Sequence, residues 1–266
     1  MCFSNFLYGA KAPTPKINNM SLQHTKGLLI GSLEIGEADR IVVLYTEDFG
    51  KIRLAARGCR RMKSRLMGST QLLTLVDVVF FKKNQGLHRL TQSDIIYSFP
   101  RLRGELRRMM AGLYVIELLN AVTPEAEPNR PVFGLTNQIL NLMNEGGDLD
   151  TLLLLYEIRL MSLAGYQPQV NHCVKCHRPL LESQQIRFIV ALGGIACESC
   201  CHSHIQGIKL SLGNLNFLRQ ALKISLDKLG RLSLTQSSKK ELQSLLRSYL
   251  AYYLERELHS TRFLEL

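Results

Sequence analysis

Two pairs of cysteines in the second half of the chain constrain its fold more than any other feature. Cys173 and Cys176 form one CxxC motif, Cys197 and Cys200 form a second, and twenty residues separate the motifs. A gap of two residues lets both thiolates of a turn reach one ion, and zinc(II) favours four such ligands in a tetrahedron. The spacing therefore predicts a structural four-cysteine zinc ribbon, with a strand at 186–190 and a turn at Gly193 and Gly194.

The sequence also permits other sets of metal ligands at this site. Cys201 directly follows Cys200, so the fourth ligand could be shifted by one residue, and a flanking histidine could replace a thiolate: His172, His177, His202 or His204. A pair of redox dithiols is the competing interpretation, but neither motif lies in a βαβ pattern. A closed four-ligand site leaves no position for a reacting water, so catalytic zinc is not expected.

The remaining cysteine usage and the N-terminus indicate a reducing compartment. Cys2 and Cys59 are isolated and are expected to be ordinary thiols, which argues against a disulfide framework. Residues 1–19 have no signal-peptide core and are expected to form a flexible leader. No run of apolar residues is long enough for a membrane span. We expect a cytoplasmic protein without a membrane partner.

Positive charge is concentrated in the N-terminal part of the chain. The net charge is +11, and residues 1–110 hold 18 Lys and Arg against 8 Asp and Glu, whereas residues 111–266 hold 15 against 14. Such segregation favours a polyanionic partner over a merely solubilising surface.

The pattern of apolar residues predicts an α+β protein of several parts. Five β-rich runs within residues 24–97 suggest a small closed barrel of the OB type. After Pro100 the apolar period becomes helical, and a capping box is expected at Ser238 and Glu241. The expected parts are a leader (1–19), an OB-fold domain (20–100), a helical domain in two pieces (101–170 and 206–266) and the inserted ribbon (171–205).

Two groups of cations are candidate nucleic-acid contacts. Side chains alternate along a strand, so Lys51, Arg53 and Arg57 should share an exposed face of the third strand. The loop that follows adds further cations and contains no acid, and a second cluster begins the first helix. The loop cations are Arg60, Arg61, Lys63 and Arg65, and the helix cluster is Arg101, Arg103, Arg107 and Arg108. Lys82, Lys83 and Arg89 add charge to the same barrel, whereas the thin aromatic inventory predicts little base stacking.

The sequence offers no sign of catalysis. It has no phosphate-binding loop, dinucleotide fingerprint, HExxH or GxSxG motif, and His24 and His88 are single histidines without a catalytic setting. We therefore expect a protein that is not an enzyme and has no small-molecule substrate.

Short motifs in order along residues 24–264 resemble the RecO family of DNA repair proteins. They include 36–40 (GEADR), 56–58 (ARG) with 63–66 (KSRL), 165–168 (GYQP) before Cys173, and 262–264 (RFL). One departure is His177, where the family usually has glycine.

The resemblance implies binding to single- and double-stranded DNA and annealing of complementary strands. It also implies loading of recombinase onto DNA coated by single-strand-binding protein, together with RecR. The acidic C-terminal tail of single-strand-binding protein should then dock in an apolar groove of the helical domain beside a cation, for which Arg130 and Arg159 are candidates. The alternatives are a zinc-ribbon protein of transcription or translation that binds RNA or polymerase, and a nuclease built on acids such as Glu34, Glu37 and Asp39.

Overall fold

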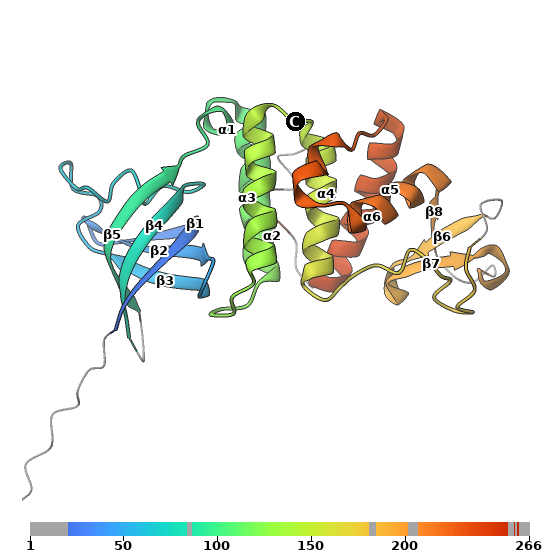
Figure 1. The fold of residues 1–266 in the computed structure, drawn as a ribbon, viewed down its shortest axis with the longest axis horizontal. Helices are drawn as coiled ribbons and strands as arrows, with labels where there is room; N and C mark the ends of the chain where they lie inside the picture. The colour runs from blue at the N-terminus through green and yellow to red at the C-terminus, as the bar shows by residue number, and fades with distance from the viewer. Residues whose placement is uncertain are drawn as a thin grey trace, which may run out of the picture.

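The computed structural model describes residues 21–83, 87–180, 185–201, 207–254, 258 and 260. The predicted leader (1–19), His202 and His204 lie outside these ranges. A five-stranded barrel, a group of packed helices and a small sheet lie one after another along the long axis of the molecule (Figure 1). The predicted α+β class, with a barrel of the OB type before a helical domain that carries a cysteine ribbon, is confirmed.

The barrel closes in the strand order β1-β2-β3-β5-β4. Only β3 and β5 run parallel, and the other pairs are antiparallel. Alternate side chains point inward, and Leu44, Leu54 and Phe80 are almost completely buried in the barrel core. The strands are β1 (Ser21–Ile35), β2 (Asp39–Thr46), β3 (Gly50–Ala56), β4 (Leu75–Lys82) and β5 (His88–Tyr97).

Six α-helices in the described ranges form the middle of the molecule. Helix α4 packs against α2, α3, α5 and α6, which explains its nearly continuous run of apolar residues. None of the helices in the described ranges is long and apolar enough to cross a membrane. The helices are α1 (Pro100–Gly104), α2 (Leu106–Val122), α3 (Arg130–Glu145), α4 (Leu149–Leu163), α5 (Leu212–Lys223) and α6 (Gln236–Leu254).

Two predictions about helix ends are wrong. The helix expected after Pro100 is broken at Glu105, whose φ of −118° and ψ of 121° are extended, so α1 and α2 are separate. Helix α6 begins before the predicted capping box, and the Thr235 hydroxyl accepts a hydrogen bond from the Ser238 amide. Glu241 instead accepts a hydrogen bond from the Ser211 amide, at the start of α5.

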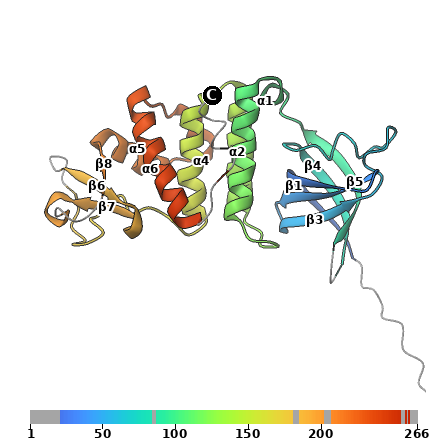
Figure 2. The same ribbon diagram turned by 180° about the vertical axis from the view of Figure 1, so that it is seen from behind.

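The ribbon lies at the far end of the helices from the barrel, as both views show (Figures 1 and 2). Its three strands are β6 (Ile186–Ile189), β7 (Gly194–Cys197) and β8 (Ile208–Leu210), in the order β7-β6-β8. The predicted turn is present at Gly193, whose φ of +67° lies in the region that favours glycine. The turn leads into β7, which ends at the second CxxC motif.

Candidate metal site and nucleic-acid interface

The fold brings the four predicted thiols together. The Sγ atoms of Cys173, Cys176, Cys197 and Cys200 all lie within 4.8 Å of one another, and 3.8 Å separates those of Cys176 and Cys197. Zinc–sulfur bonds of about 2.3 Å in a tetrahedron require sulfur atoms roughly 3.8 Å apart. The donor set and its spacing therefore fit one tetrahedral metal ion.

The proton affinities of these thiols also suit a cation. Burial alone would raise the pKa of Cys173, but the amides of Cys176, Cys197 and Lys175 donate to its sulfur and lower that pKa to about 6. Hydrogen bonding to the Cys197 and Cys176 sulfurs raises the pKa of Cys200 to about 12. Four close sulfurs cannot all become anionic without a positive ion between them.

The flanking residues that could have replaced a thiolate do not join this cluster. Among the described residues, the group of metal-binding side chains contains neither Cys201, His172 nor His177. The His177 amide donates to the Cys173 carbonyl and closes the first turn, with a φ of +58° at His177. This left-handed backbone explains why glycine suits the position. His202 and His204 lie outside the described residues.

The prediction of an exposed cationic face on β3 is wrong at Lys51. Its alternation is as expected, but the end of α2 and the following loop cover it, and the residue is only 7% exposed. The Lys51 ammonium donates to the Asn120 carbonyl, the Asn120 side-chain oxygen and the Thr123 carbonyl, at 2.9, 3.1 and 2.7 Å. Lys51 therefore joins the barrel to the helices.

Neighbouring contacts extend this junction. Arg53 remains exposed but forms an ion pair with Glu125 at 2.9 Å. The Ala126 amide donates to the Lys51 carbonyl, and a Cβ atom added at Gly50 would lie 2.2 Å from the Glu127 carbonyl oxygen. Because backbone meets backbone here, the loop after α2 is fixed against the barrel.

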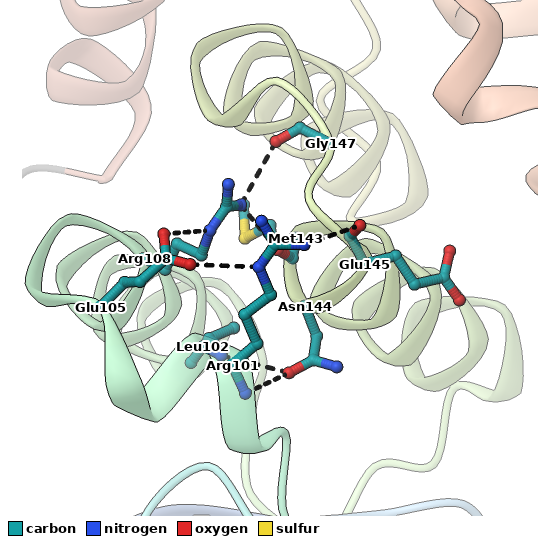
Figure 3. A network of polar contacts seen from close by, with 8 residues as sticks. All are labelled: Arg101, Leu102, Glu105, Arg108, Met143, Asn144, Glu145 and Gly147. Carbon is teal, nitrogen blue, oxygen red and sulfur yellow. Dashed lines mark hydrogen bonds and ion pairs between the residues drawn. The ribbon is translucent and has the colours of Figure 1, made fainter.

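The arginines of the predicted cluster at the first helix mainly join α1 and α2 to α3 (Figure 3). Arg108 is held by Glu105 at 2.7 Å and donates to the Met143 carbonyl at 2.8 Å, leaving its side chain only 13% exposed. Arg101 also pairs with Glu105. The Asn144 side chain accepts from the amides of Arg101 and Leu102 and so satisfies the start of α1.

The other two members of that cluster are also engaged. Arg103 donates to the carbonyls of Ser98 and Leu72 and to the Thr74 hydroxyl, and burial lowers its pKa. Arg107 is exposed and forms an ion pair with Asp150 at 3.0 Å. These contacts assign Arg101, Arg103 and Arg108 a structural part, although Arg101, like Arg107, keeps more than half of its side chain in solvent.

The cations of the loop after β3 differ from those of the first helix in their contacts. Arg57, Arg61, Lys63 and Arg65 are exposed, and in the described part of the chain none of them has an ion-pair partner. Arg60 differs, because Glu34 pairs with it at 3.2 Å. The loop is thus a concentrated and uncompensated positive surface.

The acids near this loop support its structure. Glu34 bridges Arg40 and Arg60, and the Asp39 carboxylate accepts from the Gly58 amide at 2.7 Å. Among the described residues, the only candidate group of metal ligands is the cysteine cluster. The acidic metal site that a nuclease would need is therefore not formed by the described residues.

One feature was missed from the sequence, a shallow groove of about 360 Å³ beside the end of α5. Arg219 and Lys223 border it with apolar Ile224 and Leu232. The signal was a pair of cations four residues apart on one helix, followed by an apolar residue. The earlier candidates are engaged elsewhere: Arg130 pairs with Asp48, and Arg159 donates to carbonyls that end α5, including that of Leu222.

Comparison with known proteins covers both halves of the chain. Residues 20–99 match the family described as recombination protein O N terminal, and residues 103–262 match recombination protein O C terminal. DNA repair protein RecO of Halalkalibacterium halodurans is 34% identical over 90% of this chain and 93% of its own length. The RecO protein of Roseiflexus sp. is 34% identical over 91% of this chain and 84% of its own length. The RecO protein of Desulforamulus reducens is 30% identical over 92% of this chain and 95% of its own length.

Proposed function

The chain belongs to the RecO family of DNA repair proteins, and from this membership and the charge of the β3–β4 loop we propose how it acts. It binds single- and double-stranded DNA, anneals complementary strands and, with RecR, helps load recombinase onto DNA coated by single-strand-binding protein. It does so as a binding protein without catalysis of its own, at the nucleoid.

One observation carries the DNA interface. Arg57, Arg61, Lys63 and Arg65 lie exposed on one loop, and none of them has an ion-pair partner in the part of the chain that the structure describes. Uncompensated guanidinium and ammonium groups attract phosphates and release counterions when they bind them. Arg53 and Arg107 lie outside this core interface because Glu125 and Asp150 neutralise them.

A salt-titrated binding experiment tests the interface. The triple variant R61A/K63A/R65A should weaken binding to both DNA forms and flatten the slope of log affinity against log salt by about 2 to 3. Its folding should be nearly unchanged, since exposed charges contribute little to stability. The matched control R53A removes an exposed but paired arginine and should leave most of the slope in place. An unchanged slope in the triple variant would move the DNA path elsewhere.

The same titration separates DNA from RNA. A preference for single-stranded RNA over DNA of equal length would favour a zinc-ribbon protein of transcription or translation. Equal treatment of DNA sequences would agree with contacts that are mainly to phosphates.

The metal is proposed to be zinc with a structural part. Four thiolates and their spacing suit zinc(II), and the ion would hold the two CxxC turns against β7. Elemental analysis should find one zinc per chain. Well under half an equivalent in freshly purified protein would contradict this assignment.

The groove beside α5 is proposed to bind the acidic tail of single-strand-binding protein. Ile224 and Leu232 would contact the apolar end of the tail, while Lys223 would face its terminal carboxylate and Arg219, which also donates to the Val170 carbonyl, would add positive charge beside it. Titration of a tail peptide at low salt should show binding to the wild type and weaker binding to K223E. The control K228E reverses a charge at an exposed position that does not line the groove. Equal binding by both variants would exclude this groove.

A further inference from the structure

The β3–β4 loop is an ordered platform. Cys59 is completely buried and Leu66 packs on the barrel core, so the segment between them is held at both ends. The amides of Arg61 and Ser64 donate to the carbonyls of Gly58 and Arg61, which forms successive turns. The Arg60 amide donates to the Ala38 carbonyl and ties the loop to the β1–β2 hairpin.

This platform carries a highly exposed apolar side chain, Met62. Met62 is 95% exposed, the highest value among the large hydrophobic residues described. It stands between Arg61 and Lys63, both of which lack an ion-pair partner among the described residues. Met62 is therefore an exposed apolar side chain directly beside these two cations of the loop.

Two further exposed apolar side chains lie at the other end of the loop and on the strand beside it. Met67 is 44% exposed and Ile95, on β5, is 51% exposed. A Cβ atom added at Gly68 would lie 3.5 Å from Cδ1 of Ile95, so this end of the loop lies against that strand. Exposed apolar side chains here adjoin a strongly cationic surface.

We infer that Met62 contacts the nucleobases of DNA whose phosphates are bound by Arg61, Lys63 and Arg65. A thioether side chain has no donor for a phosphate, whereas a base offers an apolar face, and methionine is among the residues that proteins insert between base steps. The barrel offers few aromatic side chains for stacking on bases, since Tyr45 and Phe80 are buried and Tyr97 packs edge-on against Phe99. The inference rests on the proposed DNA interface and adds a contact that forms only where the DNA strand carries a base.

DNA that keeps its phosphates but lacks bases isolates this contact. The dissociation constant of the full-length protein is measured by fluorescence anisotropy for a 20-nucleotide strand and for the same strand with a central run of abasic residues. Wild type should bind the intact strand roughly threefold to tenfold more tightly, as expected for partial burial of one apolar side chain. M62A should bring this ratio close to one without changing the salt slope.

Two further variants separate the possible failures. M62L keeps an apolar side chain and should retain the ratio, and R61A/K63A should lower the salt slope by about 1.4 to 1.8 while retaining a preference for bases. A 2-aminopurine base in the strand should brighten on binding to wild type, as it does when unstacked, and brighten less with M62A. An unchanged base preference in M62A would overturn the inference while leaving the phosphate contacts standing. An unchanged salt slope in R61A/K63A would instead overturn the proposed interface itself.

Discussion

Replacing Lys51 by methionine tests whether this residue joins the two halves of the molecule or contacts DNA. Methionine keeps an unbranched side chain of similar length but removes the ammonium group. The carbonyls of Asn120 and Thr123 then lose their hydrogen-bond donor at a site with little access to water, since Lys51 is only 7% exposed. The amide oxygen of Asn120 is less costly to release, because that residue is exposed and regains water.

The magnitude follows from the two carbonyls. A buried acceptor without a donor costs about 1 to 3 kcal/mol, so the variant should lose about 3 kcal/mol of unfolding free energy. At roughly 2 to 4 °C per kcal/mol for a chain of this size, the melting temperature should fall by about 6 to 12 °C. Circular dichroism of the full chain during heating and in urea measures both quantities.

The control is K26M, which removes an exposed lysine from β1 and should change stability by less than about 0.5 kcal/mol. The salt dependence of DNA binding should be the same in K51M and wild type, since Lys51 faces carbonyls. The reasoning would be refuted if K51M melted like K26M while its salt slope fell by about 0.7 to 0.9, the signature of a lost phosphate contact.

Three other changes probe the ribbon and the helices. C176S or C197S should lose bound zinc and lower the melting temperature of the full chain, because metal-binding free energy is folding free energy in such a site; full zinc content in both would contradict the ligand set. H177G should stabilise the zinc-bound chain by about 1 kcal/mol, because it removes a non-glycine residue from a left-handed backbone conformation. The control K175G, in the same turn, should not stabilise the chain. If both substitutions changed the rate of zinc loss to a chelator equally, backbone strain at His177 would not be the cause. Burial raises the pKa of Glu157 to about 7 from an ordinary 4.5, so the folded chain holds the Glu157 proton more tightly than the unfolded chain does. The stability gained from this proton is complete below pH 4.5 and is lost as pH rises through 7. E157Q keeps an acceptor for the Tyr114 hydroxyl and should flatten the fall in melting temperature between pH 5 and pH 8, and parallel curves for both proteins would exclude Glu157 as the cause.

Local chemistry was enough to predict several parts of this molecule. The spacing of Cys173, Cys176, Cys197 and Cys200 predicted the thiol cluster, because two-residue gaps and a turn at Gly193 leave few other arrangements. Alternating apolar residues predicted five strands and a closed barrel, since each strand must bury one face. The concentration of cations without acids predicted the positive loop, because a loop at the surface that contains no acid has few ways to neutralise its charge.

Only the tertiary structure decided which cations stay available. Alternation correctly placed Lys51 outside the barrel but could not show that α2 and the loop after it cover this side chain. Arg103 and Arg108 are predicted as surface charges from the sequence, yet they donate to the carbonyls of Leu72 and Met143, which lie in distant segments. Periodicity determines which side chains leave their own element, whereas packing between distant segments determines what those side chains meet.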